Sequence, residues 1–219
     1  MKTSSFRVPV SESIGEVSAE IVQPEKMKAL VVLAHGAGAG MNHAFMTKLS
    51  AALEEKGVGT LRYNFPYMEN GKKRPDVPAV ATKATERVLE AAHKLFPDTI
   101  ILAGGKSFGG RMTSQLLSKT QLEFVKGIVF VGFPLHPAGA PSVTRADHLA
   151  SIRIPMLFLQ GTRDALAELE LIKKVTTELS TATLVLFEKA DHSFKAGKKE
   201  FVNELADEVS RVCFKIVTD

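Results

Sequence analysis

Short, unbroken apolar runs recur along the chain and alternate with longer segments in which apolar residues repeat at helical spacing. An unbroken apolar run is typical of a strand covered on both faces, as in a parallel sheet flanked by helices. We expect six such strands, at residues 29–34, 59–63, 99–103, 128–131, 156–159 and 183–187. The first 22 residues predict two further strands, antiparallel and around 6–10 and 17–21.

Amphipathic segments lie between these runs and predict helices. Apolar residues fit one helix face around 45–53, and comparable faces recur at 81–95, 169–179 and 201–216. Asp76 and Pro78 are typical of an N-cap and a first-turn proline, so we expect a helix to begin there. Strands that alternate with helices predict an α/β fold, with a mostly parallel sheet of about eight strands and helices on both faces. We expect a single domain over residues 1–219.

The strand at 99–103 is followed at once by a glycine-rich turn with the pattern Gly105-x-Ser107-x-Gly109. In such a turn a strand bends sharply into a helix, the serine adopts a strained backbone, and side chains two positions away on either side would collide. A helix that starts under Ser107 directs its dipole and free N–H groups there, which favours negative charge. We therefore interpret Ser107 as a nucleophile. The alternative is a glycine-rich turn that only packs a helix on the sheet.

An acid and a base follow later strands in the order that this nucleophile requires. Asp164 stands in the loop after the strand at 156–159, and His192 in the loop after the strand at 183–187. The carboxyl ends of parallel strands share one edge of the sheet, where open α/β sheets bind ligands. We expect His192 to act as general base and Asp164 to orient it. Two alternatives stay open, Asp164 as the cap of a helix near Leu166 and His192 as a surface residue.

The first central strand ends in the loop His35-Gly36-Ala37-Gly38-Ala39-Gly40. A loop at this position supplies one backbone N–H to an oxyanion hole and the residue after the nucleophile supplies the second, so the predicted donors are Ala37 and Phe108. A dinucleotide-binding loop would need a third small residue where Met41 stands, which argues against phosphate binding. We interpret the His35 ring as structural, holding the loop by hydrogen bonds.

Other titratable residues fit catalysis less well. We assign Asp191 to a turn and place His43 and His93 on helices. His136 and His148 precede the acid in the chain, which is the wrong order for the base. No pair of histidines has metal-ligand spacing, so we expect no metal and no cofactor.

The charge pattern indicates whether the protein binds nucleic acid. The chain has a formal net charge of +4 and one compact basic run, Lys72-Lys73-Arg74. No basic helix face or aromatic interleaving accompanies this run, so we interpret it as a solvated loop and expect no nucleic-acid partner. A contact with an anionic substrate group is the minor alternative.

Cysteine usage and hydropathy indicate the compartment. Cys213 is the only cysteine, which excludes an intrachain disulfide, and we assign it to helix packing. The N-terminus lacks a signal-peptide pattern, and no apolar run approaches the length of a membrane span. We expect a cytoplasmic protein with no membrane partner.

Together, these motifs resemble the α/β-hydrolase superfamily. The resemblance is strongest to its compact dienelactone-hydrolase-like branch and to the branch with testis-expressed and chromatin-complex hydrolase-like domains. It extends over nearly the whole chain and is carried by residues 35–40, 105–111, 161–164 and 190–194. It implies an α/β-hydrolase fold with a catalytic triad of Ser107, Asp164 and His192. Dienelactone hydrolases proper have a cysteine where Ser107 stands here.

We expect hydrolysis of a small ester or thioester through a serine acyl intermediate, with a small-molecule acyl substrate as partner. The segment 133–152 is the only room for a lid, and it is short for the cover of a long-chain lipid. The alternative function is an interaction module with a hydrolase fold and no turnover, because the second branch includes proteins that serve in assembly. The sequence indicates neither an oligomeric state nor a role for Lys106. Candidate pocket walls, each with ordinary loop anchoring as the alternative, are Phe65, Tyr67, Phe133, Leu135 and Phe194.

Overall fold

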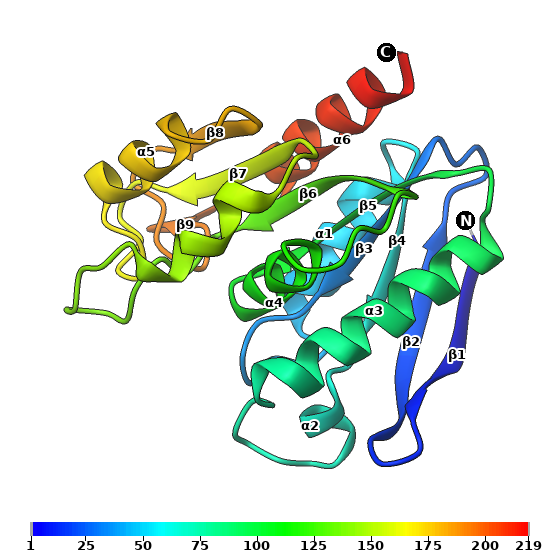
Figure 1. Ribbon diagram of the computed structural model, residues 1–219. Helices are drawn as coiled ribbons and strands as arrows, with labels where there is room; N and C mark the ends of the chain where they lie inside the picture. The colour runs from blue at the N-terminus through cyan, green and yellow to red at the C-terminus, as the bar shows by residue number, and fades with distance from the viewer. Residues whose placement is uncertain (1, 219) are drawn as a thin grey trace.

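The computed structural model of the protein describes residues 2–218 and contains one eight-stranded sheet (Figure 1). Its strands are β1 (Lys2–Ser11), β2 (Gly15–Gln23), β3 (Ala29–Ala34), β4 (Val58–Tyr63), β5 (Ile100–Lys106), β6 (Val125–Val131), β7 (Met156–Gly161) and β8 (Ala182–Phe187). They lie in the order β1-β2-β4-β3-β5-β6-β7-β8. The six strands from β4 to β8 are parallel, whereas β2 runs antiparallel to both β1 and β4. The predicted single-domain α/β fold with a mostly parallel sheet is confirmed.

Helices cover both faces of this sheet, as Figure 1 shows. They are α1 (Ala44–Glu54), α2 (Pro66–Glu69), α3 (Pro78–Leu95), α4 (Phe108–Leu117), α5 (Leu169–Thr177) and α6 (Val202–Thr218), with a 3₁₀ helix η1 (Thr144–Ser151). Helices α1 and α6 pack on one face, and α3, α4 and α5 pack on the other. Successive residues of β5 serve both layers, because Leu102 packs on the α1 side while Ile101 and Ala103 pack on the α3 side. This two-sided burial explains why the strand positions are apolar without alternation.

Some elements differ from the sequence-based expectation. Helices α2 and η1 were not predicted, nor was the short hairpin of β9 (Lys195–Ala196) and β10 (Lys199–Glu200). Helix α3 does begin at Pro78, but its N-cap residue is Val77 and not Asp76. The Asp76 carboxylate instead accepts a hydrogen bond of 2.9 Å from the Tyr67 backbone N–H, which anchors α2. The prediction of Asp76 as a cap was therefore wrong.

The segment 133–152, expected as a small lid, packs against the body of the domain. Phe133, Leu135, Leu149 and Ile152 are all buried in one apolar cluster with β6 and β7. Within residues 2–218, no helix combines the length and the apolar character that crossing a bilayer requires.

Candidate active site

Ser107 stands at the junction where β5 turns into α4. Its backbone has φ 52° and ψ −115°, a region that non-glycine residues rarely adopt. The turn passes so close to β3 that a Cβ on either Gly105 or Gly109 would lie 2.5 Å from the Ala34 carbonyl oxygen. Glycine is thus required on both sides of the serine, for the steric reason that the sequence pattern suggested. The result places Ser107 at the N-terminus of α4, where backbone N–H groups favour an anion.

His192 and Asp164 meet at the same sheet edge. The Nδ1 atom of His192 lies 2.7 Å from Oδ2 of Asp164, whose side chain is fully buried. A protonated Nδ1 donates to this carboxylate, and the lone pair of the ring is then on Nε2. The other carboxylate oxygen of Asp164 accepts from the Leu166 backbone N–H at 2.8 Å. Asp164 is not the cap of α5, whose N-cap residue is Glu168.

Ser107 and His192 line one cavity of about 490 Å³. The hydrogen bonds of residues 2–218 do not include one between the Ser107 hydroxyl and the His192 ring. In serine hydrolases this bond is often long before substrate binds and tightens in the complex. The arrangement therefore unites the Asp–His pair directly and brings the serine to the same cavity.

The loop 35–41 lies against the elbow, since a Cβ on Gly36 would be 3.8 Å from the Ser107 Cβ. The buried His35 ring bonds the Gly36 carbonyl through Nδ1 at 2.7 Å and accepts from the Phe65 N–H through Nε2 at 3.1 Å. Burial lowers the pKa of His35 to about 4, so the ring is neutral at physiological pH. The predicted structural role of His35 is confirmed.

Several side chains hold this loop by its backbone. The Tyr67 hydroxyl accepts from the Gly38 N–H at 2.7 Å, and Asn64 Oδ1 accepts from the Met41 N–H at 2.8 Å. Within residues 2–218 neither the Ala37 nor the Phe108 backbone N–H has a hydrogen-bond acceptor. Both predicted oxyanion donors are thus available to a ligand.

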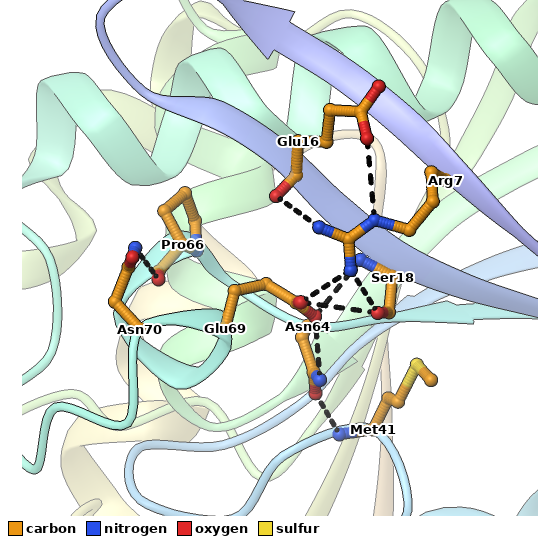
Figure 2. A network of polar contacts seen from close by, with 8 residues as sticks. All are labelled: Arg7, Glu16, Ser18, Met41, Asn64, Pro66, Glu69 and Asn70. Atoms are coloured by element: carbon orange, nitrogen blue, oxygen red, sulfur yellow. Dashed lines mark hydrogen bonds and ion pairs between the residues drawn. The ribbon is translucent and has the colours of Figure 1, made fainter.

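Asn64 belongs to a polar network that reaches the N-terminal hairpin (Figure 2). Its amide donates to Oε1 of Glu69 at 2.9 Å, and Glu69 also accepts from the Ser18 N–H and the Arg7 guanidinium. Burial tends to raise the pKa of Glu69, but the hydrogen bonds from Asn64, Ser18 and Arg7 outweigh it and lower that pKa overall. An ionised Glu69 therefore fastens the loop to strands β1 and β2.

The residues that line the cavity differ from those predicted. Phe65, Tyr67, Phe133, Leu135 and Phe194 are all buried, and none of the five lines it. They are loop anchors instead: Phe65 packs edge-on against the His35 ring, and Phe133 against Phe130. No residue of the segment 133–152 lines the cavity either. Apart from Ser107 and His192, the lining comes from Gly36, Ala37, Ala39, His43, Ala44, Phe45, Met46, Lys48, Lys106, Leu166, Ser193, Lys195, Glu200 and Val202.

Sequence reasoning missed most of this lining. It derives from the start of α1, the β9–β10 hairpin and the start of α6. Their positions in the sequence could have indicated that these residues line the cavity. His43 closely follows the loop 35–41, and Lys195 closely follows the loop of His192.

The competing titratable residues have structural partners. Asp191 Oδ1 accepts from the Ser193 and Lys195 backbone N–H groups, which confirms its assignment to a turn. His136 accepts from the Glu168 N–H, and His148 bonds the Ser114 hydroxyl at 2.7 Å. No cluster of three or more His, Cys, Asp or Glu side chains in the described part of the chain is arranged to hold a metal ion.

The geometry agrees with comparison to known proteins. A family described as an alpha/beta hydrolase domain matches residues 27–218. The chain belongs to this family. Similar solved structures include an alpha-beta serine hydrolase homologue from Coxiella burnetii, with 21% identity, a TM-score of 0.74 and coverage of 98% of this chain and 97% of that one.

Two further structures of this family's fold are similar. Est1E from Butyrivibrio proteoclasticus has 14% identity, a TM-score of 0.76 and coverage of 98% and 99% of the two chains. A dienelactone hydrolase from Anabaena variabilis has 17% identity, a TM-score of 0.74 and coverage of 96% and 97%. At these identities the likeness establishes the α/β-hydrolase fold along the whole domain.

Proposed function

We propose that this α/β-hydrolase domain is a serine hydrolase of small esters or thioesters that uses Ser107, His192 and Asp164. The observation that carries the proposal is the 2.7 Å contact between His192 Nδ1 and a fully buried Asp164 carboxylate, beside the cavity that Ser107 also lines. A buried carboxylate fixes the imidazole tautomer and stabilises the imidazolium that forms during acyl transfer. The family membership and the esterase and hydrolase folds of similar structures support hydrolysis as the reaction class.

The mechanism follows from the roles of these atoms. The Ser107 hydroxyl attacks the acyl carbon while its proton passes to His192 Nε2. The backbone N–H groups of Ala37 and Phe108 stabilise the oxyanion, and the N-terminus of α4 adds a favourable dipole. His192 then returns the proton to the departing alcohol or thiol, which leaves an acyl group on Ser107. A water molecule deprotonated by His192 releases the acid and regenerates the serine.

The size of the cavity supports a small substrate. A volume of about 490 Å³ is within the range of pockets that bind compact organic molecules. Much of the lining is apolar, including Ala39, Phe45, Met46 and Val202, which suits an acyl chain. The absence of segment 133–152 from the lining means that no lid of this segment covers the site. We infer an ester or thioester with a short acyl chain.

The first test is labelling by a fluorophosphonate probe, with the native protein compared to Ser107→Ala. We expect a single label on Ser107 in the native protein and none in the variant, because only an activated serine reacts rapidly with such probes. A folded native protein that stays unlabelled would reject the proposal and favour the non-catalytic interaction module.

The chain offers a matched pair of aspartates for a second test. Asp164→Asn removes the carboxylate that contacts His192, and we expect kcat for p-nitrophenyl acetate to fall by about 10³- to 10⁴-fold. Asp191→Asn changes the neighbouring turn residue, whose Oδ1 acceptor role an amide oxygen can retain. We expect that variant to stay within about threefold of the native rate. Equal losses in the two variants would contradict the assignment of the triad acid.

A further inference from the structure

Lys106, directly before the nucleophile, is a buried cation without an ionic partner. Its Nζ atom is shielded from solvent and has no hydrogen-bond acceptor within the described residues. The side chain nevertheless belongs to the cavity that Ser107 and His192 line. Buried polar and charged groups in folded proteins normally have partners. An ammonium without a hydrogen-bond acceptor, on a side chain that lines a binding cavity, therefore indicates that a ligand supplies the acceptor once Nζ turns toward the cavity.

Gly132 shows where Nζ lies relative to the His192 ring. A Cβ on this glycine would lie 3.2 Å from Lys106 Nζ and 3.4 Å from His192 Cε1. Both groups thus approach the same bare stretch of backbone at the end of β6. The face of the Phe194 ring, with its centroid 5.8 Å from Nζ, gives the ammonium a cation–π contact but no hydrogen-bond acceptor. Lys106 accordingly extends from the nucleophile turn toward the His192 ring, whose Cε1 lies beside the same glycine.

The neighbouring carboxylates do not accept a hydrogen bond from Lys106. Asp164, after β7, bonds His192, Gln160 and the Leu166 N–H, while Asp191, after β8, bonds two backbone N–H groups. They act on the amine only through space. Burial lowers the pKa of Lys106 to about 8, and the attraction of Asp164 and Asp191 partly opposes this shift. The amine is therefore still mainly protonated at neutral pH.

The other two lysines of the cavity already have an ionic partner, which they share. Lys48 and Lys195 form ion pairs with Glu200 at 2.6 and 2.8 Å. Glu200 is the only acidic side chain among the described residues that line the cavity. The lining thus has three lysines to one carboxylate, and the lysine without an ion pair is Lys106, next to Ser107.

We propose that Lys106 receives a carboxylate carried by the substrate, so that the preferred substrates are esters or thioesters with an anionic group. This inference rests on the proposed hydrolase function and adds a substrate class to it. The carboxylate belongs either to the acyl part or to the leaving alcohol, and the experiment distinguishes these two sources. The chemistry of hydrolysis is unchanged, because Lys106 binds the substrate and takes no part in proton transfer.

The test compares kcat/KM for two matched pairs of esters. The p-nitrophenyl half-ester of adipic acid against p-nitrophenyl hexanoate places the carboxylate in the acyl part, and 4-acetoxybenzoate against its methyl ester places it in the leaving group. Rates without enzyme are subtracted. In one of the two pairs we expect the anionic-to-neutral ratio to fall at least about tenfold in Lys106→Met, since a charged hydrogen bond is lost. Lys173→Met, which removes an exposed lysine paired with Glu170 on α5, should leave the ratio within about twofold.

Further measurements complete the experiment. The native preference should decline as pH rises through about 8, where Lys106 loses its proton beside Asp164, Asp191 and His192. Lys106→Gln serves as a second variant if Lys106→Met does not fold. Ratios that are the same in the native and Lys106 variants for both pairs would overturn the proposal.

Binding separates this proposal from the hydrolase function. Calorimetry should detect adipate or 4-acetoxybenzoate bound to Ser107→Ala, and binding at least about tenfold weaker when Lys106→Met is added. Weakened binding together with an unlabelled native protein would retain the anion site but reject the hydrolase. Fluorophosphonate labelling with binding that Lys106→Met does not affect would retain the hydrolase and overturn the anion site.

Discussion

The amide nitrogen of Gln160 donates a 2.6 Å hydrogen bond to Asp164 Oδ2, the same oxygen that contacts the His192 imidazole. Gln160 is fully buried at the end of β7, and its Oε1 accepts from the Phe133 backbone N–H at 3.0 Å. The orientation of the amide is set from both sides. Gln160 therefore positions the Asp164 carboxylate, the acid of the proposed triad.

Replacing Gln160 with leucine should impair catalysis more than it impairs folding. Leucine keeps the volume but leaves the Phe133 N–H unpaired and Asp164 less restrained, at a cost of about 1–3 kcal/mol in unfolding free energy. We expect kcat to fall about 10- to 100-fold, less than the loss on changing the carboxylate itself. Urea unfolding and p-nitrophenyl acetate kinetics measure the two effects. Gln115→Leu, at a partly exposed position on α4, is the matched control, and an equal loss of kcat there would contradict a positioning role.

Glu69 should make stability sensitive to acid. Its folded-state pKa is lower than the ordinary value of 4.5, so the ionised form contributes stability that is fully present above that value. This contribution disappears as pH falls through the folded-state pKa. Glu69→Gln should lower the unfolding free energy by about 1 kcal/mol at pH 7 and flatten its decline below pH 4.5.

Unfolding by urea between pH 3 and 7 checks this prediction for Glu69. Glu90→Gln, which breaks an exposed ion pair with Arg87 on α3, is the control. Exposed pairs contribute little, so the stability of that variant should stay within about 0.5 kcal/mol of the native protein. A larger loss of unfolding free energy in Glu90→Gln than in Glu69→Gln would contradict the prediction.

Two glycines near Ser107 should respond differently to alanine. Gly109→Ala forces a Cβ to 2.5 Å from the Ala34 carbonyl oxygen, a backbone atom with little freedom to move. We expect a loss of about 1–3 kcal/mol in thermal or urea unfolding, typical of overpacking. Gly36→Ala meets its nearest atoms at 3.6 Å, an ordinary contact, and should change stability by less than about 1 kcal/mol. Comparable stabilities of the two variants would show that the elbow relaxes more easily than its geometry indicates.

Cys213 should be unreactive in the native protein. It is fully buried in α6, and burial raises the pKa of its thiol to about 12. The reactive species is the thiolate, so iodoacetamide at pH 8 should leave the folded protein unmodified and alkylate it fully in guanidinium. Rapid alkylation without denaturant would contradict the packing of α6 on the sheet.

The sequence predicted the candidate site residues where a reactive side chain directly follows a strand. Ser107, Asp164 and His192 each follow a strand of the parallel sheet, so the order of strands and motifs along the chain was enough to predict their convergence at one edge. The cavity lining could not be predicted in this way, because Lys48 and Glu200 are 152 positions apart and meet only when α1 and α6 pack on the same face. The role of aromatic residues such as Phe65 was ambiguous, because loop anchors and pocket walls use the same residue types. Asp76 failed as a cap because a tertiary contact with Tyr67 replaced the local one.

The hydrogen bonds of Glu69 show that residues outside the family match support the candidate site. The family match begins at residue 27, after the β1–β2 hairpin, yet Arg7 and Ser18 of that hairpin hold the carboxylate that secures Asn64 and, through it, the loop 35–41. A fragment trimmed to residues 27–218 would keep every residue of the proposed triad and lose this support, together with β2, one of the two strands that pair with β4. Comparative or engineering work that adopts the boundaries of the match would therefore be measuring a site with an unsupported loop.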